Sequence, residues 1–164
     1  MPIVSAEIQY RLSGGAANAN SDASLGGVVS ATVAPVGLFD TITGAQSLAG
    51  SVEYRCFYVR NNNASLALQN AVLFIQANTP SADTTVAIGL GTSAINGVEQ
   101  TVANKSTAPV GVTFSEPATL GTGLALGTIP ATQHKAVWIR RTINAAAAAS
   151  NDTYNLRTTG DTAA

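Results

Sequence analysis

The chain has 164 residues and a formal net charge of −1, which suits one domain without a field that would attract nucleic acid or an anionic membrane. Charged residues make up only 10% of the sequence, against a usual share of about 25%, and Ala, Thr, Ser, Asn and Gly take their place. A single cysteine, Cys56, excludes a disulfide within the chain, and no apolar run approaches the roughly 20 residues that cross a membrane as a helix.

Short stretches in which apolar and polar side chains alternate recur along the chain, and Gly, Pro and Asn separate them. In the first stretch, Ile8, Tyr10 and Leu12 share one face at a spacing of two residues. The expected strands cover residues 3–12, 28–34, 52–59, 71–77, 84–91, 132–143 and 153–159, and residues 124–130 lead into the strand 132–143.

Three segments between these strands lack a core-forming pattern. Residues 13–27 form a long loop of small residues, which we expect to contact neighbouring subunits. Residues 92–123 alternate short apolar pieces with Asn, Gly and Pro, so we expect loops and short edge strands there. The alanine run 145–149 is too short to nucleate a helix alone, so we expect a loop or a single helical turn.

Two of the expected strands have the pattern of central strands in a sheet. In residues 52–59, one face presents Cys56 between two tyrosines, while the other begins with Glu53 and Arg55 and then becomes apolar. We expect the polar start of that second face to point to solvent. Residues 71–77 are apolar on both faces, which is typical of a strand covered on both sides.

Two side chains are predicted to be buried in this arrangement. Cys56 alternates with tyrosines on an apolar face, so we expect a buried and unpaired thiol. Trp138 is the only tryptophan and lies in the strand AVWIRR, so we expect it to pack against residues 52–59.

About eight short strands, with turn residues between them and no helical periodicity, predict an all-β sandwich or barrel. We expect a single domain over residues 1–164. Within it, residues 1–49 supply N-terminal strands and an assembly loop, and residues 50–164 form the core.

The core region carries a recognisable order of motifs between residues 50 and 160. GSVEYRCFYVRNNNASLALQNAVLFIQANTP comes first, LALGTIPATQHKAVWIRRTI follows, and DTYNLRTTGD closes the series. This order resembles an immunoglobulin-like module of bacterial and phage surface proteins. The resemblance implies an immunoglobulin-like antiparallel β-sandwich with a long N-terminal strand and loop extension. The paired cysteines of antibody domains are absent, so the resemblance concerns the sandwich and not a disulfide core.

The whole chain is also similar to virion structural proteins of tailed bacteriophages. The shared features are the Ala/Thr/Asn/Gly-rich composition, the single cysteine, the lack of a signal-peptide pattern and the leading EIQYRLSGGAANANSDASLGG. The resemblance implies an assembly protein made in the cytoplasm of a bacterial host and located in the virion. Capsid decoration and a tail or fibre role are both compatible with it.

Candidates for chemistry are scarce. His134 is the only histidine and has no nucleophile motif beside it, so we expect a solvated residue at a strand end. Arg140 and Arg141 are the only basic pair, and on a strand they point to opposite faces, which argues against a nucleic-acid-binding patch. One of them is expected to pair with a carboxylate at a subunit contact.

The carboxylates show no spacing that suggests a paired acid and base. Asp40, Asp83 and Asp152 each lie beside threonine in turn-like sequence, so we expect them to cap turns. The calcium-loop pattern of alternating aspartates is absent, and the glycine motifs lack the spacing of a phosphate-binding loop. We therefore assign no catalytic, cofactor-binding or metal-binding residue and no cofactor. Binding of a glycan or calcium by a loop stays open.

These observations favour a structural role over an enzyme. We expect a virion protein of a tailed phage, most simply a capsid decoration or cement protein that forms homo-oligomers and contacts the major capsid protein. A tail, baseplate or fibre protein is the first alternative. A carbohydrate-binding or adhesin sandwich is the second, and it would need an exposed row of aromatic side chains.

Overall fold

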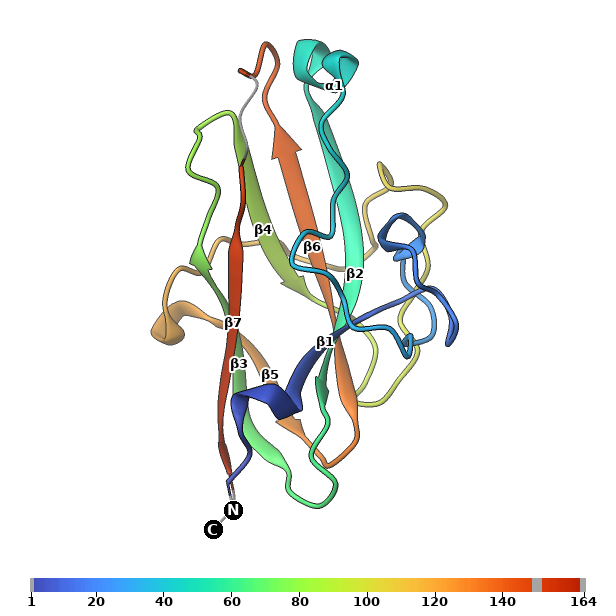
Figure 1. Cartoon of the computed structure of the whole chain (residues 1–164), viewed down its shortest axis with the longest axis vertical. Coiled ribbons are helices and arrows are strands. Elements are labelled where there is room, and N and C mark those ends of the chain that lie inside the picture. The colour runs from blue at the N-terminus through green and yellow to red at the C-terminus, as the bar shows by residue number, and fades with distance from the viewer. Residues whose placement is uncertain (1, 149–151, 163–164) are drawn as a thin grey trace.

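The computed structural model describes residues 2–148 and 152–162, which form two antiparallel sheets and little helix. One sheet has four strands in the order β1-β2-β6-β4, and the other has three in the order β5-β3-β7 (Figure 1). The strands are β1 (Ile8–Leu12), β2 (Ser51–Asn61), β3 (Leu68–Ala77), β4 (Thr84–Leu90), β5 (Leu124–Ile129), β6 (His134–Ile143) and β7 (Asn155–Thr162). The prediction of an all-β sandwich is confirmed at this level.

The helical elements are short. They are α1 (Gly44–Ala49) and three single 3₁₀ turns, η1 (Ser5–Glu7), η2 (Ser21–Ala23) and η3 (Leu120–Thr122). Helix α1 begins at a capping box, because the Thr43 hydroxyl accepts from the Gln46 backbone and the Gln46 side chain accepts from the Thr43 backbone. The pattern Thr-x-x-Gln is visible in the sequence, but no helix was among the expected elements.

Six of the seven strands expected by residue range are present, the strand expected over residues 28–34 is wrong, and β5 forms in the segment that leads into β6. That segment runs beside β1 and forms three backbone hydrogen bonds with it, at 2.8 to 3.1 Å. It is too irregular to continue as a ladder, and only Val33 forms an isolated bridge, to Arg11. Residues 92–119 contain loops and isolated bridges within the described chain, without a further strand.

The main core lies between the two sheets. β2 and β3 are central strands, as the sequence predicted, because each pairs with a neighbour on both sides. The fully or nearly fully buried side chains of this core are Leu12, Leu38, Phe57, Val59, Leu68, Ala71, Leu73, Ile75, Val86, Ile88, Leu126, Ile129, Val137 and Ile139. Side chains that alternate in sequence therefore meet on the inner faces of both sheets.

The outer face of the four-stranded sheet has a second, smaller core. Cys56, Tyr58, Ala136 and Trp138 are buried there, and side chains from loops pack over them. Figure 1 shows the loops that follow β1 and β4 gathered beside β2 and β6. The four-stranded sheet is thus buried on both faces, and the predictions that Cys56 and Trp138 are buried, and that Cys56 is unpaired, are confirmed.

The loop 13–27 is held by the sheet itself. The Ser13 hydroxyl donates to the Cys56 carbonyl at 2.9 Å, and the Cys56 amide donates to the Ser24 carbonyl at 2.8 Å. The Tyr58 hydroxyl donates to the carbonyl of Gly27. These bonds within one chain explain why the loop has a defined conformation. The defined conformation therefore does not support contact with other subunits, and that contact stays a prediction.

Three side chains that we expected at the surface are buried. His134 is 8% exposed, because the loop after β4 folds over the start of β6, and its ring meets Tyr58 edge-on at 4.7 Å. Burial lowers the pKa of His134. Glu53 and Arg55 are 1% and 0% exposed, since they lie on the same inward face of β2 as Phe57.

Replacing Trp138 by alanine should lower the free energy of unfolding by about 3–5 kcal/mol, because a large, fully buried side chain leaves a cavity between the loops and the sheet. Urea denaturation followed by circular dichroism measures the change. Val110→Ala is the control, since Val110 is 80% exposed and should change stability by less than about 0.5 kcal/mol. Equal effects of the two substitutions would contradict the burial of Trp138.

Candidate functional site

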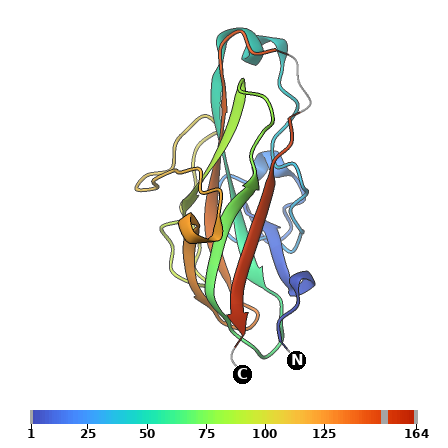
Figure 2. The ribbon, with the colours of Figure 1, turned by 90° about the vertical axis from the view of Figure 1, so that its left-hand side faces the viewer.

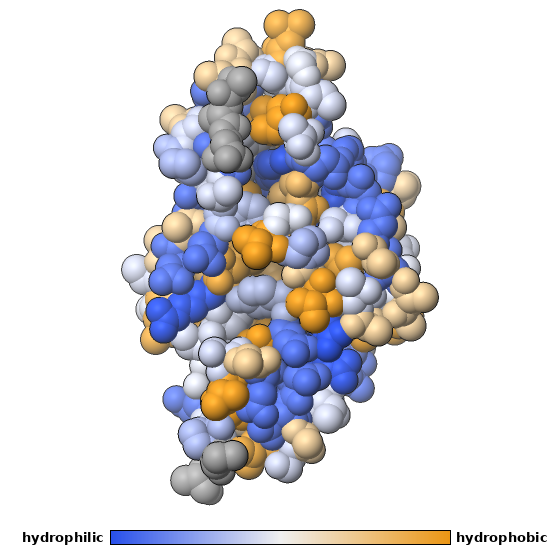
Figure 3. Space-filling model, viewed as in Figure 1, coloured by the Kyte–Doolittle hydropathy of each residue, from blue (hydrophilic) through white to orange (hydrophobic). Residues whose placement is uncertain are grey.

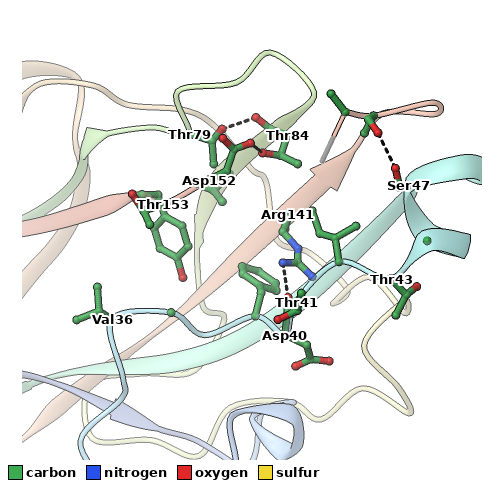
Figure 4. A pocket seen from close by; sticks show the side chains of 18 residues that line it. Val36, Asp40, Thr41, Thr43, Ser47, Thr79, Thr84, Arg141, Asp152 and Thr153 are labelled. Atoms are coloured by element: carbon green, nitrogen blue, oxygen red, sulfur yellow. Dashed lines mark hydrogen bonds between the residues drawn. The ribbon is translucent and has the colours of Figure 1, made fainter. Parts of the chain in front are cut away.

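A hollow lies beneath α1, at the end of the sandwich opposite the chain termini (Figure 4). Its volume is about 700 Å³, within the range of small-molecule pockets. Segment 36–44 and the ends of β4 and β6 form its walls. The polar side chains that line it are Asp40, Thr41, Thr43, Ser47, Thr79, Thr84, Arg141, Asp152 and Thr153.

Most hydroxyl groups around this hollow already serve the fold. Thr84 donates to the carboxylate of Asp152, and Thr79 donates to the backbone carbonyl of Thr84. Ser47 donates to the carbonyl of Ala147 at 2.6 Å. Figure 4 shows these pairs on the walls of the hollow, and two of them, Thr84–Asp152 and Ser47–Ala147, join segments that are distant in sequence. They are structural contacts, and the expected turn-capping role of Asp152 fits them.

Arg141 connects the hollow to a cluster of charges that is partly buried. Its guanidinium donates two hydrogen bonds to one oxygen of Glu53 and a third to the Asp40 carbonyl at 2.8 Å. The other oxygen of Glu53 lies 3.0 Å from Lys105 Nζ. The Arg141 guanidinium also stacks over the Phe39 ring at 4.7 Å. The pairing of Arg141 with a carboxylate was expected at a subunit contact, but the structure places it within the chain.

The charge cluster continues through Asp40. This carboxylate accepts from Lys105 at 2.9 Å and approaches Arg55 at 3.5 Å, and Arg55 also pairs with Asp22. Contact with the Asp22 carboxyl, together with Lys105 and Arg55, lowers the pKa of Asp40 to about 2. Asp40 thus belongs to a network of ion pairs, and not to a simple turn cap as we expected.

The cluster is electrically balanced, with three basic and three acidic side chains. Burial raises the pKa of Glu53, but the bonds from Lys105 and Arg141 outweigh this effect and leave it below the usual value. A general base at neutral pH needs a pKa near 7, so neither Asp40 nor Glu53 suits that task. The geometry therefore favours a structural network over an acid–base site.

Replacing Glu53 by glutamine should lower the free energy of unfolding by about 3 kcal/mol, because Arg141 would keep a buried charge without its partner. Urea denaturation at neutral pH tests this. Glu116→Gln serves as the control, since Glu116 is exposed and outside the cluster. A loss no larger than that of the control would show that the cluster adds nothing to stability.

A second buried carboxylate, Glu99, fixes the loop after β4 over the outer core. Glu99 accepts from the backbone amides of Thr92 and Ser93 at 3.1 and 2.8 Å and from the Trp138 indole at 3.3 Å. The Glu99 amide in turn donates to the Tyr58 hydroxyl at 3.0 Å. Burial raises the pKa of Glu99, but the bonds from Ser93, Thr92 and Trp138 outweigh it and lower the pKa to about 2.

The stabilisation by Glu99 should depend on pH. Its pKa is about 2 in the folded chain and about 4.3 in an unfolded one, so the contribution is complete above about pH 4.3 and is lost as pH falls through about 2. Glu99→Gln should cost about 2–3 kcal/mol at pH 7 and much less at pH 2. Urea denaturation of both proteins at the two pH values measures this difference. An equal cost at both would contradict a charged carboxylate in the folded state.

The remaining candidates do not form a site. Arg140 and Arg141 point to opposite faces of β6, as predicted: Arg140 lies over the Phe114 ring at 5.3 Å, on the outer side. Asp83 accepts from the Ala148 amide at 3.0 Å, which agrees with the expected capping role. Across residues 2–148 and 152–162, no three His, Cys, Asp or Glu side chains are grouped so that they could bind a metal. In the same residues, no helix is both long and apolar enough to span a membrane.

The outer edges of the sheets offer a different kind of site. In the four-stranded sheet, both edges are covered by the chain itself. Residues 30–34 bond to the backbone of β1. On β4, the side chain of Asn78 bonds to both backbone groups of Val86 at 3.0 Å, and Ser115 exchanges two backbone bonds with Ile88 at 2.8 and 3.0 Å.

In the part of the chain that the structure describes, no further backbone hydrogen bonds cover the edges of the three-stranded sheet. Figure 2 shows this sheet, with β3 between β5 and β7. The backbone of β5 receives one hydrogen bond besides its ladder with β3, from the Asn61 side chain to Ile129 at 3.0 Å. Within the described residues, β3 is the only strand that pairs with the backbone of β7, and the Tyr10 hydroxyl is the one other group that approaches it, at Thr158. Exposed backbone groups of this kind can pair with another chain.

β5 and β7 differ in regularity. β5 contains an extra residue between its pairs with Ala71 and Val72, and Gly127 has a φ of 80° there. A bulge of this kind bends a strand and blunts its edge. In β7 the register shifts come from extra residues on β3, so β7 itself is continuous from Asn155 to Thr162. The free edge of β7 is therefore the candidate interaction site, and no sequence signal that we used pointed to it.

The outer surface is weakly charged. Three of the eight basic and three of the nine acidic residues lie in the charge cluster around Arg141. Figure 3 shows apolar side chains on one face of the molecule as separate patches between polar ones. Tyr58 and Trp138 are buried, and Tyr10 and Tyr154 pack against the main core, so these aromatic side chains do not form an exposed row.

Comparison with protein-family models, with curated proteins and with solved structures finds no match to this chain. The fold and the sites described above are therefore the basis for a functional conclusion.

Proposed function

We propose that this chain is a structural subunit that stabilises a large assembly and performs no chemistry. The observation that supports this most directly is the uncovered, regular edge of β7 on a weakly charged body. Backbone groups at such an edge provide contacts by strand addition, and a surface with few charges loses little hydration energy when copies pack side by side.

We further propose that the assembly is the virion of a tailed bacteriophage, made in the cytoplasm of the bacterial host. The similarity to virion structural proteins in composition, in the single cysteine and in the leading EIQYRLSGGAANANSDASLGG supports this step. A capsid decoration or cement protein is the first choice, because small contacts repeated over many copies add up to resistance against internal pressure. A tail, baseplate or fibre protein is the alternative. In either case the partners are other virion proteins and further copies of this chain.

We propose that the sandwich belongs to the wider immunoglobulin-like group. Its division into sheets of four and three strands supports this, as does the motif order between residues 50 and 160. Relative to the antibody constant domain, the fifth and sixth strands have exchanged sheets: β6 lies beside β2, and β5 lies beside β3. The proposal therefore concerns the architecture and not the strand order of antibodies.

The test compares phage particles that contain this protein with particles that lack it. Under heat or chelator stress, particles without it should release DNA at a lower temperature or a lower chelator concentration. Dye access to DNA during a temperature ramp measures the release, and adding back the purified protein should restore the original profile.

Two other outcomes would change the conclusion. Particles without the protein that are equally robust, but fail to attach to the host, would assign it to the tail or fibre. Particles unchanged in both robustness and infection would contradict the structural proposal.

A further inference from the structure

We infer that two copies of this chain associate through β7, which pairs antiparallel with β7 of the second copy about a twofold axis at Thr159. The two three-stranded sheets would then form one six-stranded sheet, β5-β3-β7-β7-β3-β5. This inference rests on the proposed function, because it names the contact by which subunits of the assembly first join.

The outer backbone edge of β7 is free to pair, and the strand is already held in its extended conformation. The side chains of β7 that face inward hold it in place: Thr158 shares a hydrogen bond with the Tyr10 hydroxyl at 3.0 Å, and the Thr162 hydroxyl accepts from the Ile3 amide at 3.1 Å. Leu156 packs against the main core. The strand is thus fixed on its inner side while its free backbone edge has no partner in the described chain, so little order must be gained on pairing.

The outer face of β7 carries one charge of each sign. Arg157, Thr159 and Asp161 share this face, since they lie opposite the outward residues Phe74, Val72 and Gln69 of β3. Arg157 and Asp161 are exposed. Arg157 takes part in none of the salt bridges of the described chain, whereas Asp161 accepts one hydrogen bond, from Asn70 at 2.9 Å.

These positions are self-complementary in one register. Arg157 and Asp161 each lie two residues from Thr159, so a twofold axis at Thr159 places each arginine opposite the aspartate of the other copy. Residues directly opposite each other in an antiparallel pair have Cβ atoms about 4.5–5.5 Å apart, and opposite charges there are stabilising. An axis at Arg157 or at Asp161 would instead place like charges opposite each other, which is destabilising.

The register also uses the strand almost completely. An axis at Thr159 pairs residues 156–162 of the two copies, nearly the whole of β7. Contact between two strands alone is small compared with a stable dimer interface, so we expect a weak association that depends on protein concentration. Such an association suits a subunit that is held in place by many further contacts in an assembly.

The test exchanges the two charges. Sedimentation velocity over a concentration series should show a monomer–dimer equilibrium for the parent chain. Arg157→Glu and Asp161→Arg should each raise the dissociation constant about tenfold or more, because each places like charges opposite one another twice. The double variant Arg157→Glu/Asp161→Arg restores complementary pairs with the parent net charge, so it should return the dissociation constant close to the parent value.

A second variant tests the axis directly. Thr159→Cys places one thiol opposite its own copy, and mild oxidation of the dilute protein should give a covalent dimer rapidly. Thr128→Cys, on the bulged edge of β5, is the matched control and should react far more slowly. Cys56 is buried and does not compete under these conditions.

The outcomes separate the inference from the proposed function. A monomer at all accessible concentrations, a dimer insensitive to both charge reversals, or equal crosslinking at positions 159 and 128 would overturn the inference. If the single reversals abolish dimers and yet protect particles as well as the parent does, the inference about assembly fails while the stabilising role stands. If the dimer behaves as expected and the protein has no effect on any particle, the proposed function fails instead.

Discussion

The pairing of β2 with β6 is the constraint on which the rest of the structure depends. The two strands stay in register over ten residue pairs, from Ser51 opposite Ile143 to Arg60 opposite His134. Their side chains alternate between two apolar faces, so a single covering layer cannot bury both. The three-stranded sheet covers one face. The loops after β1 and β4 cover the other, and for this reason a loop of small residues becomes an ordered part of the fold.

The same pair of strands explains where the charges are. Near α1, the inward face of β2 and β6 changes from apolar side chains to Glu53, Arg55 and Arg141, and the covering segments bring Asp40 and Lys105 to meet them. Buried charges persist only where they are paired, so the cluster is balanced and confined. Since the sequence has few charged residues and three basic and three acidic ones lie in this cluster, the surface elsewhere carries mainly hydroxyl, amide and small apolar groups.

Much of this architecture could be predicted from alternation alone. The strands around Cys56, Phe74, Ile88 and Trp138 were found because apolar positions at a spacing of two are a local signal. The burial of Glu53, Arg55 and His134 could not be found in that way. Arg55 pairs with Asp22, 33 residues away in sequence, and Glu53 pairs with Arg141, 88 residues away. No local sequence pattern indicates contacts over such distances. The free edge of β7 was equally hidden, because an edge is a property of strand order.

The bulge at Gly127 has a consequence for the behaviour of the chain at high concentration. A sheet with two regular open edges can add further sheets at both sides without limit, and such growth ends in fibres. Here the left-handed backbone at Gly127 interrupts one edge of the three-stranded sheet, so that sheet has one regular edge to offer. Association through that edge closes on itself after two copies, because a twofold contact uses the same surface on both partners. If the chain has the proposed assembly role, in which many copies accumulate, this closure would protect those copies against aggregation.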